Sequence, residues 1–287
     1  MTPAPRPHLI AQGPTSGPPL LVCAGGNGNV RSISGLMDWL AHRKFRVFSY
    51  QRPEPDGQEP IPMAHHVADL IAAVAMIAGS DVTARETDGQ NITGRRVDVF
   101  GTSFGALLAL HASVAEPRAF RRLVAHEPPA FNLLPEPARQ SAYAEHRDVE
   151  EALRANPASR AALDRLAVIT GTRFDDGWET SFPPRPDRQP DRPARFHPQA
   201  QVVRQSLLSP TGLRSSVRAG VSILPALGST ARGHAPYLAA EAIGRIVGVD
   251  AVRFPGSHSG ATSHPLAFAD TLARILGAPL TPGAGAL

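Results

Sequence analysis

The chain alternates short apolar runs with longer segments in which apolar residues recur at helical spacing. The short runs, mostly bounded by glycine, proline or charged residues, predict buried strands at 19–24, 45–50, 96–100, 121–126, 221–227 and 251–254. The helical spacing predicts helices at 33–43, 63–78, 103–115, 234–247 and 264–276. This alternation predicts an α/β fold with a doubly wound, mostly parallel sheet, whose ligands bind at the carboxyl ends of the strands.

The pattern changes between residues 130 and 218. A helical piece at 136–154 is followed by a stretch rich in proline and arginine near 183–198. Because the strand and helix alternation resumes afterwards, we interpret 130–218 as an inserted helical cap. Residues 1–129 and 219–287 then form the core, and the proline- and glycine-rich end at 279–287 is expected to fray.

Composition narrows the class of protein. Hydrophobic residues make up 42% of the 287 residues, enough for a sizeable core, and a single cysteine, Cys23, excludes an internal disulfide. We find no uninterrupted apolar run of about 18 residues, so no membrane-spanning helix is expected. The N-terminal residues lack the apolar segment of a secretion signal, which predicts a cytoplasmic protein.

The charge pattern argues against nucleic acid as a partner. The formal net charge is +4, and the basic residues are scattered arginines rather than runs interleaved with aromatic residues. The expected partner is a small-molecule substrate, with no nucleic acid and no membrane, in a monomer or homodimer.

The strongest chemical signal is the segment Gly101-Thr102-Ser103-Phe104-Gly105. It matches G-x-S-x-G between a predicted strand and a predicted helix, the context in which a serine is lifted above the sheet as a nucleophile. The glycines avoid clashes in the sharp turn, and the helix N-terminus offers N–H groups to a developing oxyanion. The alternative interpretation is an ordinary tight turn with a serine N-cap.

A second signal follows the last predicted strand. His258 lies in the loop 254–260 and can reach back over the sheet edge to take the proton from Ser103. His264 is the rival candidate, but it precedes a proline at a helix start and is interpreted as structural.

These motifs resemble the α/β-hydrolase superfamily over nearly the whole chain. The elbow GTSFG, the turn AGGNG after the first predicted strand and the segment GSHSG near the C-terminus come in the family's order. More narrowly, the HEPP segment at 126–129 resembles a group of mostly uncharacterised actinobacterial hydrolases. The resemblance implies an oxyanion hole made by the N–H groups of Gly26 and Phe104, with Asn27 as an alternative first donor.

The acid of a catalytic triad departs from the usual pattern. Many family members carry an aspartate after the strand that follows the cap, but residues 228–233 contain no carboxylate. The superfamily's second position, after the strand before the cap, is occupied by Glu127, which we predict to orient His258. The alternatives are a turn-capping or arginine-paired role for Glu127, a hydroxyl from Ser229 or Thr230, and a dyad without an acid. Asp250 is expected at the opposite end of the last strand.

The cap is expected to line the substrate pocket. The predicted substrate contacts are Phe131, Leu134 and Trp178 of the cap, together with Asn27. The apolar residues of the cap suggest a hydrophobic acyl or polycyclic substrate. His65, His66 and His126 show no metal-ligand spacing, so neither a metal nor another cofactor is predicted.

The sequence therefore predicts a serine-dependent hydrolase of an ester or thioester, with esters of specialised metabolites among the candidates. Two other classes stay open. One is a non-hydrolytic enzyme on the same scaffold, such as a lyase, cyclase or acyltransferase, and the other is a catalytically inert binding protein.

Overall fold

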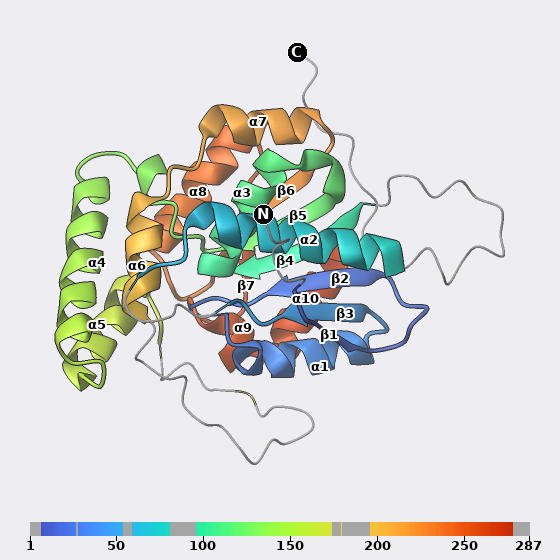
Figure 1. Ribbon diagram of the computed structural model, residues 1–287, viewed down its shortest axis with the longest axis horizontal. Coiled ribbons are helices and arrows are strands. Elements are labelled where there is room, and N and C mark those ends of the chain that lie inside the picture. Colours follow the sequence, from blue (N-terminus) through green and yellow to red (C-terminus); the bar gives the residue numbers. More distant parts are fainter. Residues whose placement is uncertain are drawn as a thin grey trace.

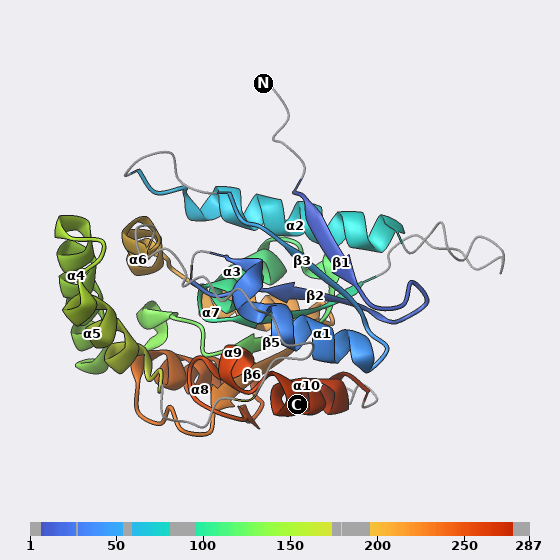
Figure 2. The same cartoon turned by 90° about the horizontal axis from the view of Figure 1, so that it is seen from below.

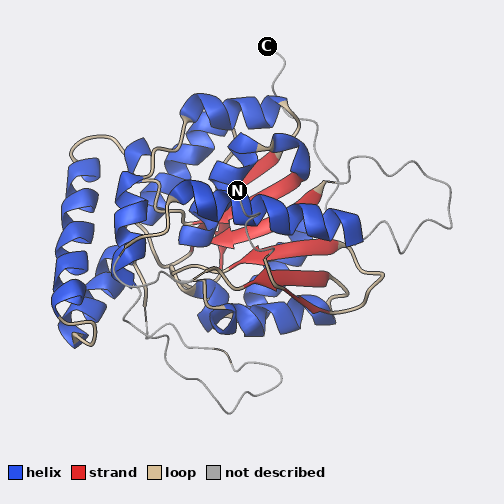
Figure 3. Ribbon diagram, viewed as in Figure 1, coloured by secondary structure: helices blue, strands red, loops and turns tan. Residues whose placement is uncertain are grey.

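A seven-stranded sheet forms the centre of the molecule (Figures 1 and 3). The computed structural model describes residues 7–26, 28–53, 59–80, 96–173, 179 and 196–277. The strand order is β1-β3-β2-β4-β5-β6-β7, and all neighbours are parallel except β1, which pairs antiparallel with β3. The strands are β1 (Leu9–Gln12), β2 (Pro19–Cys23), β3 (Arg46–Tyr50), β4 (Val97–Thr102), β5 (Phe120–His126), β6 (Ser222–Gly228) and β7 (Val252–Phe254).

The strands predicted from the sequence are present and pair in parallel. Helices cover both faces of the sheet. Strands buried on both faces read as continuous apolar runs, and every residue of β4 is buried. The edge strand β1 was not predicted. It has only four residues and is half-buried or exposed along its length, so it carries no strong apolar signal.

The helices form two layers, one on each face of the sheet. On one face α2 (Met63–Ser80), α3 (Phe104–Ala115), α7 (Pro210–Arg218) and α8 (Ala235–Val247) contribute to one apolar cluster with the sheet. On the other face α1 (Ser34–His42) and α10 (Pro265–Gly277) contribute to a second cluster. Figure 2 shows α2 on one side of the sheet and α1 and α10 on the other. The short helix α9 (Gly260–Ser263) precedes α10.

Helix α2 is long and strongly apolar. Its 18 residues have a mean hydropathy of 1.4, so it is the one helix of the described residues that is long and apolar enough to cross a membrane. The sequence analysis expected no such helix because Asp69 and two histidines interrupt the apolar run. In the fold α2 packs against α3 and buries Leu70, Val74 and Ile77, and 28% of the helix is buried.

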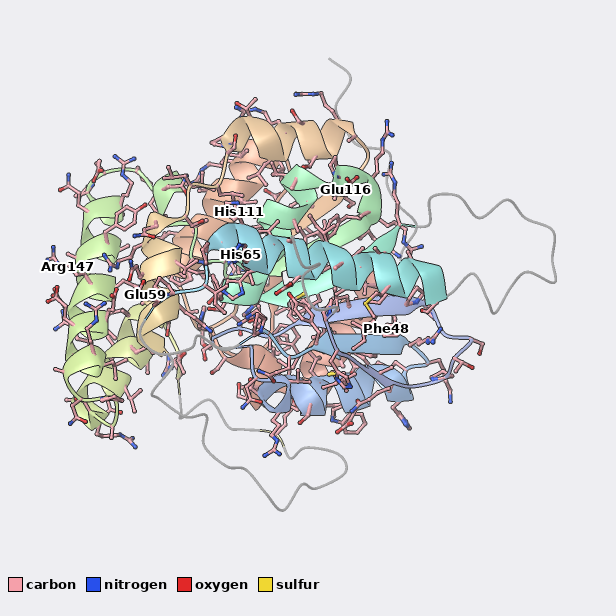
Figure 4. The ribbon with its side chains drawn as sticks, in the orientation of Figure 1. Phe48, Glu59, His65, His111, Glu116 and Arg147 are labelled. Atoms are coloured by element: carbon pink, nitrogen blue, oxygen red, sulfur yellow. The ribbon has the colours of Figure 1, made fainter. Side chains whose placement is uncertain are left out.

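Three helices between β5 and β6 form a group at one end of the molecule, at the left of Figure 1. They are α4 (Ala138–Ala155), α5 (Arg160–Thr170) and α6 (Phe196–Gln205). Glu150 of α4 is buried and pairs with both Arg154 and Arg204, which joins α4 to α6. Arg147 lies on the outer side of α4, away from the sheet (Figure 4). The cap boundaries at 130 and 218 stay a prediction, and α7 packs on α3 and α8 rather than on α4 to α6.

Hydrogen bonds join the two ends of the insertion to each other and attach it to α3 of the core. The side-chain amide of Asn132 donates to the carbonyl of Leu208 and accepts from its N–H. His111 Nε2 of α3 lies 2.7 Å from Ser206 Oγ, just after α6. Both contacts are local to the junction, so they hold α6 close to the sheet edge.

The direction in which the chain adds strands to the sheet changes at β2. The next strand in the chain, β3, pairs on one side of β2, whereas β4 pairs on the other side. The loops that leave β2 and β4 therefore diverge, since α1 lies on one face of the sheet and α3 on the other. Such a switch point opens a crevice at the carboxyl ends of the two strands, and both Ala24–Gly26 and the GTSFG segment lie there.

Candidate active site

Ser103 stands on a strained turn between β4 and α3. Its φ of 52° and ψ of −123° lie in a region that side-chain-bearing residues rarely adopt. A Cβ on Gly101 would lie 2.7 Å from the backbone of Ala106, and one on Gly105 would lie 2.4 Å from the carbonyl oxygen of Cys23. Both positions therefore require glycine, and the turn lifts the serine hydroxyl above the sheet edge.

The sheet's hydrogen bonds continue into the site. The N–H of Ser103 donates to the carbonyl of His126 at 2.8 Å, and the N–H of Glu127 donates to the carbonyl of Ala226 at 3.0 Å. The ends of β4, β5 and β6 are thereby fixed relative to one another. Ser103 and Glu127 are placed by backbone contacts and do not depend on side-chain packing alone.

Glu127 is a fully buried carboxylate at the end of β5. Its φ of 45° is also left-handed, which turns the side chain back over the sheet edge. The N–H of Gly228 donates to Oε1 at 2.7 Å, and Oε2 lies 2.8 Å from Nδ1 of His258. Burial favours the neutral acid, but these hydrogen bonds and the nearby His126 outweigh burial and lower the pKa of Glu127. The side chain is therefore ionised near neutral pH.

His258 bridges Glu127 and Ser103. Its Nε2 lies 3.0 Å from Ser103 Oγ, opposite the contact of Nδ1 with Glu127. A carboxylate only accepts hydrogen bonds, so Nδ1 carries the proton and the unprotonated Nε2 faces the serine hydroxyl. The structure thus brings together the three residues that the sequence selected, in one chain of hydrogen bonds.

Gly228 lets the histidine loop cross the end of β6. A Cβ at this position would lie 2.7 Å from the carbonyl oxygen of Ser257, which precedes His258. The same residue donates its N–H to Glu127. The sequence analysis did not select Gly228, although a glycine directly after an apolar strand is the signal that could have found it.

The other candidates for the orienting group, and the rival histidine, have other contacts or positions. Ser229 Oγ donates to the carbonyl of Gly256 at 3.2 Å. Asp250 precedes β7, at the end of that strand far from the loop that carries His258. His264 bonds through Nδ1 with the neighbouring Ser263 at 2.8 Å. Glu127 is the carboxylate in contact with His258.

The two residues predicted to supply the oxyanion hole, Gly26 and Phe104, both line the pocket that contains Ser103. Phe104 is the first residue of α3, so its N–H has no intrahelical acceptor. Gly26 has a left-handed φ of 47° and lines the same pocket as Ser103 and Phe104. Asn27, the alternative donor, lies outside the described residues.

A buried arginine supports the Gly26 turn from behind. Arg52, only 2% exposed, donates to the carbonyl oxygens of Ala24, Gly25 and Gly26 and lies with its guanidinium carbon 5.1 Å from the Phe104 ring centre. Burial lowers its pKa. Among the described residues no carboxylate pairs with it, so its charge acts on the carbonyls of the turn.

Gly28 makes room for this arginine. A Cβ there would lie 2.7 Å from Arg52 Nε. The sequence analysis missed Arg52 because a lone arginine after a strand looks like a surface residue.

A small pocket opens above Ser103, with a cavity of about 40 Å³. The core supplies Gly26, Ser103, Phe104, Pro129 and Pro236 to its wall.

The three cap helices supply the rest of the wall: His146 from α4, Thr170 from α5, and Gln199, Ala200 and Val203 from α6. The pocket surface is mostly apolar, as expected, with Ser103, His146, Thr170 and Gln199 as the polar residues of its wall.

The predicted substrate contacts fall in other places. Phe131 and Leu134 are buried in the apolar cluster around α3 and are not among the residues that line the pocket. The Phe131 ring lies 4.8 Å, between ring centres, from that of His146, which does line the pocket. Trp178 lies outside the described residues.

His146 and Gln199 were missed by the sequence analysis. His146 continues the buried stripe of α4 formed by Ala142, Val149 and Leu153, so a histidine within a helical apolar stripe was its signal. Gln199 gave no signal. In the described part of the chain no group of three or more His, Cys, Asp or Glu side chains is arranged to hold a metal ion.

The chain has the α/β-hydrolase fold, as the sequence predicted. A carboxylesterase of the thaumarchaeon Nitrososphaera gargenis superposes with a TM-score of 0.63 at 13% identity, covering 94% of this chain and 93% of the other. An esterase from Thermogutta terrifontis also gives a TM-score of 0.63, at 15% identity, with coverages of 94% and 92%.

A curated relative matches in sequence as well. The uncharacterized hydrolase YraK of Bacillus subtilis (strain 168) is 25% identical over 273 residues, which span 91% of this chain and 89% of YraK. No protein-family model matches the chain.

Proposed function

We propose that the protein is a serine hydrolase that cleaves a carboxylic ester or thioester. The observation that carries this proposal is the unbroken chain of hydrogen bonds from Ser103 through His258 to Glu127. Ser103 is the nucleophile, His258 is the general base and then the general acid, and Glu127 holds the imidazole in the required tautomer.

The geometry supports the following sequence of steps. Ser103 Oγ attacks the substrate carbonyl while its proton passes to His258 Nε2. The N–H groups of Gly26 and Phe104 stabilise the tetrahedral oxyanion. The leaving alcohol or thiol takes the proton from Nε2, and an acyl-enzyme remains. Water then attacks the acyl group while His258 accepts its proton. The second tetrahedral intermediate collapses as His258 returns a proton to Ser103 Oγ, and the carboxylic acid leaves.

Similar proteins support the reaction class. The superposed structures include a carboxylesterase and an esterase, and the relative in sequence is named a hydrolase. In this proposal the substrate is a small molecule, a specialised-metabolite ester among the candidates, and the reaction needs no cofactor. The monomer or homodimer and the cytoplasmic location expected from the sequence belong to the same proposal.

The test is hydrolysis of short p-nitrophenyl esters and matched thioesters in ¹⁸O-labelled water. We expect one ¹⁸O atom in the acid product with wild-type protein and no turnover with Ser103→Ala. Product without solvent oxygen would indicate elimination, cyclisation or acyl transfer instead. Tight ligand binding without any turnover would indicate a binding protein.

A further inference from the structure

The pocket that contains Ser103 is lined by a buried amide whose oxygen has no hydrogen-bond partner among the described residues. Gln199 is 6% exposed, lies on α6 and lines the pocket together with Ser103. Within the described part of the chain its Oε1 atom has no hydrogen-bond partner. Buried polar groups in folded proteins are nearly always bonded, so an unbonded amide facing a ligand pocket calls for a partner from outside the chain.

The rest of the pocket wall is mostly apolar, and its polar residues are uncharged. His146 is buried, and burial together with the nearby Arg204 and His258 lowers its pKa to about 4, so the imidazole is neutral near pH 7. Thr170 Oγ1 donates to the carbonyl of Leu166 at 2.9 Å. Among the described residues that line the pocket, none carries a charge. An ionised substrate group would be buried there without a counter-ion, which is strongly unfavourable.

The size of the pocket limits the group that binds. A cavity of about 40 Å³ holds roughly three water-sized groups. A hydroxyl on a short chain fits this space, and it both donates and accepts, so it satisfies the amide whichever way the amide is turned. A carboxylate lacks the donor and adds a charge.

We propose that Gln199 is a specificity-determining residue that binds a hydroxyl group of the substrate, so that the protein cleaves short hydroxylated esters in preference to plain alkyl esters. This inference rests on the proposed ester hydrolysis. A site built to bond a hydroxyl discriminates against the analogue that lacks it, because the buried amide is then left unpaired.

The experiment compares esters in which a methyl group replaces the hydroxyl. For the acyl side the pair is p-nitrophenyl 3-hydroxybutanoate and p-nitrophenyl 3-methylbutanoate. For the alcohol side it is 2-hydroxypropyl butanoate and 2-methylpropyl butanoate. We expect kcat/KM to favour the hydroxylated ester by about tenfold or more in one pair, and that pair identifies the side of the ester that faces Gln199.

The variant Gln199→Leu should bring the ratio of kcat/KM within that pair close to one, because it removes the hydrogen bond that only the hydroxylated ester can make. Gln205→Leu is the matched control, since Gln205 lies on the same helix but is exposed. It should keep the wild-type ratio. Gln199→Met serves as a second variant if the leucine variant does not fold.

Two results would overturn the inference. Wild-type protein could cleave both members of each pair equally well, or Gln199→Leu could keep the preference. The first result requires no variant, so it holds whatever the variants do. The absence of hydrolysis with all four esters, together with an unreactive Ser103, would instead overturn the proposed function itself.

Discussion

The edge of the sheet and the cap build their shares of the site in different ways. At the sheet edge, Gly26, Ser103 and Glu127 all have left-handed φ angles between 45° and 52°, and backbone hydrogen bonds join the neighbouring strand ends. In the cap, the wall consists of side chains from three helices. The positions of the catalytic residues thus depend on a backbone conformation that few substitutions preserve. The pocket wall, in contrast, can be altered by substituting one side chain at a time.

This difference predicts two kinds of mutational effect. Substitutions at the sheet edge should lower kcat for every ester, because they act on the transition state. Substitutions in the cap should change KM and the choice between esters, because they act on binding.

The largest effect is expected for Glu127→Gln. The amide can still face the N–H of Gly228, but it no longer stabilises the imidazolium or fixes its tautomer. We expect kcat to fall about 10³- to 10⁴-fold with little change in KM. Steady-state kinetics with a p-nitrophenyl ester measures this. Glu116→Gln, at an exposed carboxylate, is the control (Figure 4). A decrease of less than tenfold would remove Glu127 from the mechanism.

The next effect is expected for Arg52→Met. The loss of the guanidinium frees the carbonyls of Ala24, Gly25 and Gly26, so the N–H of Gly26 is no longer held in place. We expect kcat to fall about 10²-fold, comparable to removal of one oxyanion donor, with KM nearly unchanged. Arg52→Lys should retain part of the activity. If KM rose while kcat stayed constant in a folded variant, Arg52 would act on binding instead.

A cap substitution should have a smaller and different effect. Glu150→Gln weakens the contacts of residue 150 with Arg154 on the same helix and with Arg204 on α6. Both arginines are partly exposed. We expect the free energy of unfolding to fall by about 1 to 3 kcal/mol, with KM raised several-fold and kcat kept. Urea unfolding and kinetics measure the two effects. Glu151→Gln, exposed on the same helix, should change neither. A large loss of kcat would show that the cap also orders the sheet edge.

The last effect concerns stability alone and leaves turnover near neutral pH unchanged, since it is the pH dependence of unfolding. Burial lowers the pKa of His126 at the sheet edge and of His146 in the cap to about 4. In the unfolded chain both bind protons below about pH 6.5, so the unfolded state binds more protons between about pH 6.5 and 4. Stability should therefore fall as pH falls through this window, by about 1.4 kcal/mol per pH unit for each histidine at most.

Urea unfolding at pH 7, 6 and 5 checks this slope. The variants His126→Phe and His146→Phe should each reduce it by the share of one histidine. An unchanged slope in either variant would mean that the replaced histidine does not remain neutral in the folded protein.

Much of the sheet edge could be predicted from the sequence. Parallel strands covered on both faces read as apolar runs, and the required glycines at 101 and 105 leave a pattern in the chain. Glu127 was found because the other candidate position, after β6, contains no carboxylate.

The cap and the supports of the site could not be predicted as well. Gln199 and His146 come together only through the packing of α4 on α6, which no local pattern specifies. Arg52 is buried against carbonyls that lie more than 20 residues earlier in the chain. Phe131 and Leu134 were assigned to the pocket because apolar residues of the core and of a pocket wall look alike in sequence.

The most direct test of the central claim is intact mass after exposure to a fluorophosphonate probe. The probe labels a serine whose hydroxyl is activated by a histidine and whose developing oxyanion is stabilised. We predict a single adduct on wild-type protein, none on Ser103→Ala, and slowed labelling on Glu127→Gln. Folded wild-type protein that forms no adduct, or Ser103→Ala protein that still forms one, would contradict the account.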